Sequence, residues 1–466
     1  MSISERLVKA PRRKWVIGCS LVGVLVLGLV GFAVLQVVDY PVVALRAEKV
    51  AAEYRAAGLP WVAEDLEKFS GTGSNVGEPM VTILEDRVPL WSKKSQPIFD
   101  LIAEGKYGQA RREVDALSAP TVREFAAMGS LDQIWLSKDW DLGPNVLFPE
   151  YADVKIGVKM LSARAELRAR DGDLNGALAD LRSSYAISNK VGRNPNLIAM
   201  LVGIACRAIT NRAVLYVADA RPNDSAWIDR LRVEVEGWRP EADLNLAMQG
   251  EAYMGVAFYR NFRGRIVPGS FDFEEAARYN PSDRLKRSGF PEGVMNRAMM
   301  VRHMEAHVDM QKIVKKFEGD PVGMTRALDK FTASFESGPL KLSQLGNRVL
   351  FPVYSQAGEA VAKDEMMPKI AAAVLWARGE KIRTGSYPKS GKRYEIIDFH
   401  TGDFVKVKII GERIVVYSIG KDGVDQGGAN LLDYGGKGDD LGEAFPPKKR
   451  EAIVKSGGSS GGPGPR

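Results

Sequence analysis

Cysteine is scarce in this chain, which has two cysteines in 466 residues. Cys19 lies in an uncharged apolar run near the N-terminus, and Cys206 lies in a second apolar stretch, where it is expected to be a small core residue. Because only one cysteine lies outside the first run, no disulfide is expected within the main part of one chain. Stability must then come from a large hydrophobic core, which a chain of this length can supply.

Histidine is almost as scarce, with three residues in the chain. His303 and His307 are four residues apart, so on a helix they would share a face and could hold a metal. Their order, H-M-E-A-H, is neither the H-E-x-x-H nor the H-x-x-E-H of zinc hydrolases. No third ligand stands nearby, because His400 belongs to a different region. A metal-dependent hydrolase around His303 and His307 is therefore the alternative function, not the first.

The sequence motifs of several common enzyme classes are also absent. The sequence has no G-x-S-x-G elbow, P-loop, dinucleotide fingerprint or C-x-x-C pair. Its net charge of +7 does not indicate nucleic-acid binding, because residues 1–14 carry +4 and residues 446–466 another +4, which leaves −1 for the rest. We expect no nucleic-acid partner, and we expect a binding protein before an enzyme.

A long apolar run is what the sequence does contain. Residues 15–38 are 24 consecutive residues without a charge. A helix of that length rises roughly 36 Å, enough to cross a hydrocarbon core of about 30 Å. The run therefore predicts a single membrane-spanning anchor.

The flanking charges predict the orientation of this anchor. Residues 1–14 form a basic tag, which is expected to stay in the cytoplasm, with the bulk of the chain extracytoplasmic or periplasmic. A cleaved signal peptide would have a shorter run followed by an A-x-A-like site, and none stands near residues 36–40. The lipobox-like string ending at Cys19 opens the apolar run instead of closing it. An uncleaved anchor in the inner membrane is the preferred interpretation.

The middle of the chain predicts helix after helix. Residues 42–69 read as helical with a break near Gly58, and residues 70–74 are a Gly/Ser-rich linker. In residues 97–117 and 155–187, turns centred on Gly105 and Gly172 separate pairs of helices. These turns resemble the middle of a tetratricopeptide repeat, but two half-matches favour helical hairpins over a true repeat array.

Two segments of this middle region need separate interpretation. Residues 196–217 are strongly apolar, but Arg207 and Arg212 interrupt them, so a buried core helix is predicted instead of a second span. Residues 260–297 alternate arginines with aromatic residues and contain several Pro and Gly. Such a segment suits an anionic partner or a lipid surface. A loop packed across the helices is the preferred interpretation.

Near residue 370 the pattern changes from helical to alternating. A helix ends at Gly385-Ser386-Tyr387-Pro388, and three short strands are predicted at residues 394–398, 404–410 and 413–419. Gly411-Glu412 fits a type II′ hairpin turn with Gly first. The sequence thus predicts a small antiparallel module after the helical region.

This C-terminal part resembles the major pseudopilin of type II secretion systems. The resemblance covers residues 368–441 and rests on the G-x-Y-P helix end, the small sheet, and the string Y-S-I-G-K-D-G at 417–423. It implies a loop that binds calcium, closed by a late acidic pair. The pseudopilin cleavage site is not matched, because Gly31-Phe32 lies near the end of the apolar run and Gln36 stands where the family has Glu. The chain is therefore not expected to enter a pilus fibre.

The whole chain is also similar to a group of bacterial membrane-anchored helical proteins whose function is not established. These proteins share a segment like residues 55–60, a helical middle like residues 171–213, and the same kind of C-terminus. The resemblance implies an architecture more than a role.

The residues of the acidic loop also suit calcium on their own chemistry. Ca²⁺ prefers six to eight oxygen ligands, and four carboxylates lie close together in the sequence, with glycines between them that let carbonyls turn inward: Asp422, Asp425, Asp439 and Asp440. The alternative is an Asp/Gly-rich turn in which each Asp accepts hydrogen bonds from its own backbone. A structural Ca²⁺ is the preferred interpretation, because uncompensated carboxylates so close would repel.

Together these patterns predict a mainly α protein of six parts. They are a cytoplasmic tag (1–14), a transmembrane anchor (15–38), a juxtamembrane helix and linker (39–78), an all-α helical-hairpin domain (79–367), a pseudopilin-like helix with an antiparallel β module (368–445), and a disordered tail (446–466). The predicted function is a membrane-anchored scaffold or partner-binding protein of the cell envelope, with a calcium-stabilised C-terminal module and a link to secretion or envelope organisation.

Overall fold

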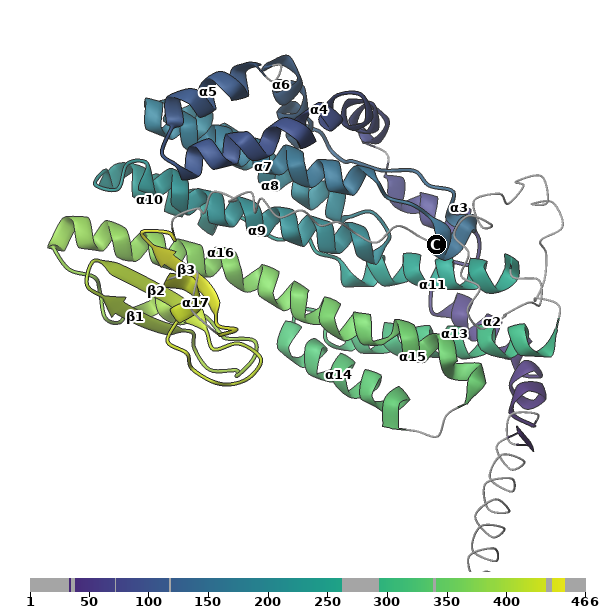
Figure 1. Cartoon of the computed structure of the whole chain (residues 1–466). Coiled ribbons are helices and arrows are strands. Elements are labelled where there is room, and N and C mark those ends of the chain that lie inside the picture. Colours follow the sequence, from purple (N-terminus) through teal and green to yellow (C-terminus); the bar gives the residue numbers. More distant parts are fainter. Residues whose placement is uncertain are drawn as a thin grey trace, which may run out of the picture.

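A computed structural model describes residues 33–34, 38–71, 73–116, 119–261, 293–337, 341–432 and 438–448. These residues are mainly helical with one small antiparallel sheet, which confirms the predicted class (Figure 1). The longer helices are α2 (Ala47–Ala56), α4 (Gly77–Ala103), α5 (Tyr107–Ala116), α6 (Ala119–Ala127), α7 (Glu150–Asp171), α8 (Leu174–Gly192), α9 (Leu197–Asp219), α10 (Ser225–Glu236), α11 (Leu244–Asn261), α13 (Val294–Lys316), α14 (Pro321–Ser337) and α16 (Pro352–Thr384). Three shorter helices are α3 (Ala63–Glu67), α15 (Leu345–Leu350) and α17 (Ala429–Leu432).

The predicted helical hairpins are confirmed at α4–α5 and at α7–α8. Gly172 ends α7 in the left-handed region at φ +88°, which an L side chain rarely adopts. Asp173 then caps α8 by accepting a hydrogen bond from the Gly176 amide at 2.9 Å. Between α8 and α9 the backbones approach closely at a pair of glycines, since a Cβ on Gly203 would lie 2.7 Å from the Cα of Gly192. Small residues therefore permit the close packing of this hairpin stack.

Helix α9 is the central core helix that its sequence predicted. Among the described residues it is the one helix whose length and composition would allow a membrane span, yet 56% of its most apolar window is buried inside the protein. It packs between α8 and α16 (Figure 1). The predicted anchor at residues 15–38 lies almost wholly outside the described residues, as does most of the segment 260–297.

A buried ion pair joins α9 to α16. Arg207 is fully buried, and its Nη2 lies 2.6 Å from Oδ2 of Asp364, while its Nε donates to the same oxygen at 2.8 Å. The Nη1 group of Arg207 donates to Oδ1 of Asn189 at 3.0 Å, so α8 belongs to the same network. The charge that interrupts the apolar pattern of α9 thus holds three helices together.

Helix α16 is continuous across residue 368, the predicted start of the C-terminal module. Pro368 lies inside the helix, and Gly385 ends it at φ +84°. Its later half contributes Ile370 and Val374 to one core with Ile414 and Val416 of the sheet. The module therefore shares its hydrophobic core with the helical body.

The sheet has three antiparallel strands in the order β1–β2–β3: β1 (Lys406–Ile410), β2 (Arg413–Ser418) and β3 (Leu441–Phe445). Gly411 takes a positive φ of +57° at the β1–β2 turn, as predicted. The predicted strand at 394–398 is wrong, because this stretch forms a single bridge, between Ile397 and Phe404. The buried carboxylate of Asp398 causes the difference: it accepts hydrogen bonds from the His400 amide at 2.9 Å and the Ser418 hydroxyl at 2.8 Å, which bends the chain into a loop.

Strand β3 was not predicted. Its Glu443 is buried and pairs with Nε of Arg212 in α9 at 2.8 Å, a partner that no local pattern reveals. The chain that follows is also packed, since the carbonyl of Lys448 accepts a hydrogen bond from the Tyr216 hydroxyl at 2.9 Å. Lys448 thus contacts α9, and residues 449–466 of the predicted tail lie outside the described residues.

Candidate functional site

The four predicted metal ligands do gather in one loop region beside the sheet. Oδ2 of Asp439 accepts hydrogen bonds from the amides of Lys421 and Asp422, at 2.9 and 3.1 Å. Gly420 must be a glycine here, because it has φ +71° and a Cβ would collide with the Asp439 carboxylate. Residues far apart in sequence therefore meet through this carboxylate.

Two of the four carboxylates are used by the turn itself. Asp422 accepts from the Val424 amide at 2.8 Å and from the Gln426 side chain at 2.6 Å. Oδ1 of Asp425 accepts from the Tyr417 hydroxyl at 2.9 Å and from the Gly427 amide at 2.8 Å. These bonds match the Asp/Gly turn that the sequence left as an alternative.

The other two carboxylates each retain a free oxygen. Oδ1 of Asp439 and Oδ1 of Asp440 are buried and have no hydrogen-bond partner among the described residues. Burial raises the pKa of Asp440, whereas for Asp439 the backbone hydrogen bonds outweigh burial and lower the pKa. In the described part of the chain, no group of three or more His, Cys, Asp and Glu side chains is arranged to hold a metal. Of the four carboxylates, Asp422 and Asp425 are thus occupied by the turn, whereas Asp439 and Asp440 each keep one oxygen without a hydrogen-bond partner in the described ranges.

His303 and His307 lie in the packed core, not in a cleft. Both are 1% exposed, their ring centroids are 4.3 Å apart, and His307 contacts the rings of Phe351 and Tyr354. Nε2 of His303 is 3.2 Å from the Ala252 carbonyl, so that nitrogen carries the proton and donates it. Helix α11 can approach this closely because a Cβ at Gly255 would strike the His303 ring.

Burial strongly favours the neutral form of both rings. It lowers the pKa of His303 to about 4 and that of His307 well below 6.5. Neither nitrogen of His307 has a hydrogen-bond partner among the residues described. The two rings are titratable groups buried in the core. Among the described residues, no third His, Cys, Asp or Glu side chain joins them to form a metal site.

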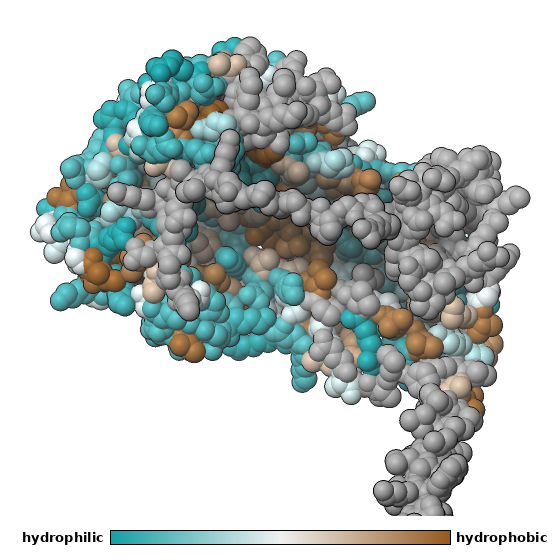
Figure 2. All heavy atoms as spheres, in the orientation of Figure 1, coloured by the Kyte–Doolittle hydropathy of each residue, from teal (hydrophilic) through white to brown (hydrophobic). Residues whose placement is uncertain are grey.

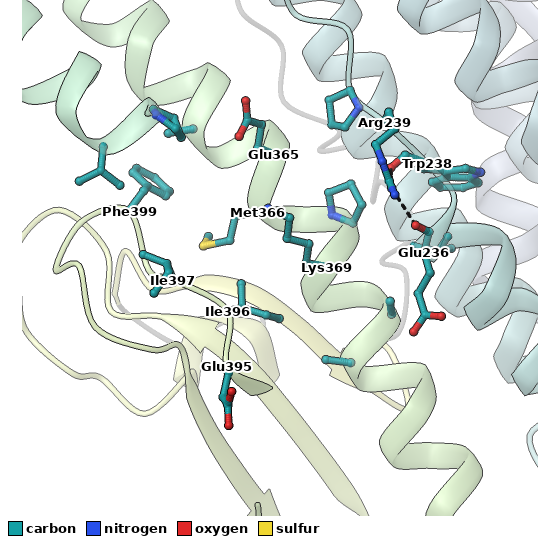
Figure 3. A pocket seen from close by; sticks show the side chains of 18 of the residues that line it. Glu236, Trp238, Arg239, Glu365, Met366, Lys369, Glu395, Ile396, Ile397 and Phe399 are labelled. Carbon is teal, nitrogen blue, oxygen red and sulfur yellow. Dashed lines mark hydrogen bonds between the residues drawn. The ribbon is translucent and has the colours of Figure 1, made fainter. Parts of the chain in front are cut away.

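A cleft of about 930 Å³ lies on one flank of α16, between the C-terminal module and the ends of α10 and α14. Small side chains on α16 leave the space: Ala362, Ala372 and Ala373. Figure 3 shows Ile396, Ile397 and Phe399 of the module on one side of α16, with Trp238 and Arg239 on the other. The volume falls in the range of ordinary ligand and peptide sites.

The charged groups of the cleft are only partly paired. Glu236 forms an ion pair with Arg393, and Arg239 donates from Nη1 to the Glu236 carbonyl at 2.7 Å. Glu365 and Glu395 have no ion-pair partner in the described part of the chain, and carboxylates outnumber cations by one in the lining. Burial raises the pKa of Glu365, with Lys369 opposing and Asp364 adding to the effect. The cleft is therefore apolar with an acidic bias.

No family model, curated protein or solved structure matches this chain. Its function must be argued from the sites themselves. The cleft could not be predicted from the sequence, because its walls come from segments that are far apart in the chain and meet only in the fold: α10, α14, α16 and the 395–399 loop. Exposed Ile397 and the single prolines Pro240 and Pro321 beside two helix ends are local signals, but they do not specify a common cleft.

The buried histidines predict a pH effect on stability. Their pKa values are lower in the folded chain than in the unfolded chain, so stability should be full above pH 6.5 and should fall as pH drops toward about 4. For His303 the difference corresponds to at most about 3 kcal/mol. Glu251 acts in the opposite direction, because burial raises its pKa to about 7.

Comparison with variants separates these two effects. His303→Leu and His307→Leu should each flatten the loss of unfolding free energy between pH 6.5 and 4, measured by urea unfolding, while the Glu251 contribution stays the same. A variant and a wild type with parallel pH profiles would show that the rings do not titrate as buried groups.

Proposed function

We propose that this chain is a single-pass inner-membrane protein that binds a protein partner outside the cytoplasm. The uncharged run at residues 15–38 and the basic tag before it support the anchor and its orientation. Asp39, directly after the run, contacts Arg302 at 3.2 Å and also Ser343 and Lys341. These contacts support a helical body that sits close to the membrane without a long flexible spacer.

The cleft beside α16 is the observation that carries the binding role. It combines a large apolar lining with carboxylates that have no ion-pair partner, chiefly Glu365. A protein segment that presents aliphatic or aromatic side chains next to a Lys or Arg would fill the space and neutralise Glu365. Apolar anchors surrounded by complementary charge are the usual composition of such interfaces.

The pseudopilin resemblance supports a role in secretion or envelope organisation. A helix that ends at Gly385, the Tyr387-Pro388 pair and an antiparallel sheet follow in the order that the resemblance implies. The module differs from a free pilus subunit in its packing, since Ile414, Val416 and Phe445 are buried against α16 and neighbouring helices. We therefore propose a fixed head, not a fibre subunit.

A structural Ca²⁺ in the acidic loop is part of this proposal. Asp439 and Asp440 would hold the ion through their free oxygens, and Asp422 and Asp425 would shape the loop through the hydrogen bonds that they already accept. Bound Ca²⁺ would neutralise the two adjacent carboxylates and rigidify the loop. The alternative hydrolase around His303 and His307 has no comparable support, because both rings are buried and neither lines the cleft.

Calcium should raise the thermal stability of the protein. Binding to the folded state alone adds about 2.7 kcal/mol at a hundredfold excess over Kd. Asp439→Ala and Asp440→Ala should each abolish the shift, and Asp309→Ala, an exposed acid on α13, should retain it. Differential scanning fluorimetry in EDTA and in calcium measures the effect. Equal shifts in all four proteins would refute the site.

A photo-cross-linking residue at position 397 should capture the partner in membranes. Ile397 is 50% exposed at the cleft, and Val233, 59% exposed on α10, is the matched control position. Glu365→Lys should weaken binding of the purified partner about tenfold or more by repelling its cation. The same products from both positions, or products that do not respond to Glu365→Lys, would contradict the cleft as the binding site.

A further inference from the structure

A second groove, of about 790 Å³, lies on another face of α16. Its walls come from α4, α7, α9, α16 and the α17–β3 segment, with Phe99 on α4 and Lys363 and Met367 on α16. Glu365, Met366 and Lys369, which line the cleft, are not among its residues. Figure 2 shows hydrophobic side chains gathered in a central hollow, with hydrophilic surfaces above and below it. This groove is therefore separate from the cleft.

The apolar floor of the groove is the exposed side of α9. Ala208 is exposed and Ile209 half-buried there, although α9 is otherwise a core helix. Half-buried Leu201, Val202 and Ala205 continue the same stripe toward the helix start, where Ile198 is 49% exposed. An apolar stripe of this length at a groove marks a contact surface.

The groove has an excess of positive charge. Its lining holds three cations, Lys159, Arg212 and Lys363, against two carboxylates, Asp440 and Glu443. Lys159 of α7 and Lys363 of α16 line different walls, and Lys363 is near enough to Glu443 to oppose the rise that burial causes in its pKa. Arg212 is neutralised by Glu443 at 2.8 Å. The lining therefore keeps a net excess of one positive charge, which favours an anionic ligand.

Polar atoms without partners also line the groove. The Ser162 hydroxyl is buried in α7, and Oδ1 of Asn430 is buried in α17; neither has a hydrogen-bond partner within the described ranges. A hydrocarbon chain would leave both unsatisfied, at a cost of about 1–3 kcal/mol each. A peptide can satisfy them, because it supplies N–H donors and C=O acceptors.

The sheet adds a third reason to expect an extended peptide. β3 is an edge strand, paired on one side with β2, and Leu441, Gly442 and Glu443 of β3 line the groove. Among the described residues no strand covers its second edge. Edge strands commonly receive an extended peptide through backbone hydrogen bonds.

We propose that this groove binds an extended acidic peptide segment of a partner protein. Its apolar side chains would lie on Ala208 and Ile209, and its carboxylates would contact Lys159 and Lys363. Its backbone would lie along β3 within reach of Ser162 and Asn430. The groove recognises negative charge, whereas the cleft recognises positive charge.

The test uses the full-length protein and a short fluorescent peptide that alternates valine and glutamate. Saturable binding by fluorescence anisotropy is expected, and the Lys159→Glu, Lys363→Glu double variant should weaken it at least tenfold, or about 1.4 kcal/mol. The Lys49→Glu, Lys312→Glu double variant, an equal charge change at exposed residues of α2 and α13, should leave the affinity unchanged. Thermal unfolding of each variant verifies that it is folded.

Three results would overturn the proposal. A peptide that alternates valine and lysine could bind equally well, which would remove the charge argument. Sodium oleate could displace the acidic peptide and bind more tightly, which would assign the groove to acyl anions. A chain that ends at Lys448 could bind the peptide at least tenfold more tightly, which would assign the groove to the chain's own C-terminal residues.

Discussion

The ion pair between Arg207 and Asp364 is the interaction on which the arrangement of α16 depends. Two charges removed from water carry a large desolvation cost, which is offset only when their geometry and hydrogen bonds are good. Here the guanidinium contacts the carboxylate at 2.6 Å and also donates to Asn189. Any rotation or slide of α16 against α9 would separate these atoms, so the pair fixes the position of the helix.

The position of this one pair also sets the chemistry on either side of α16. Successive residues of an α-helix point about 100° apart. Asp364 faces the core, Lys363 before it lines the groove, and Glu365 after it lines the cleft. Three consecutive charged residues of α16 thus point into three different environments: the groove, the core and the cleft. An ammonium is presented to one side and a carboxylate to the other, which is why the two hollows differ in the charge they would accept.

Local signals in the sequence were sufficient to predict the helices and the tight turn between β1 and β2. Gly172 and Asp173 have conformational and capping preferences that act within a few residues, so the α7–α8 turn was predictable. The same holds for Gly411 at the β1–β2 turn.

The features that could not be predicted from the sequence depend on contacts between residues far apart in the chain. Glu443 is tolerated in β3 because of Arg212, more than two hundred residues earlier, and Asp398 bends a predicted strand through bonds to Ser418. The sequence identified the four acidic residues of the loop as a group. Only the structure shows that two of them, Asp422 and Asp425, accept hydrogen bonds within the turn. It also shows that Asp439 and Asp440 each keep a free oxygen. The cleft and the groove had no local signature, because the cleft is assembled from four separate segments and the groove from five.

Urea unfolding of Arg207→Met, Asp364→Leu and the double variant tests most directly whether this pair holds α16 in place. Each single variant leaves one buried charge without its partner, and we predict a loss of about 3–5 kcal/mol in the free energy of unfolding. The double variant, with apolar side chains on both helices, should recover most of that loss. Single variants within about 0.5 kcal/mol of the wild type, or a double variant no more stable than the singles, would contradict the account.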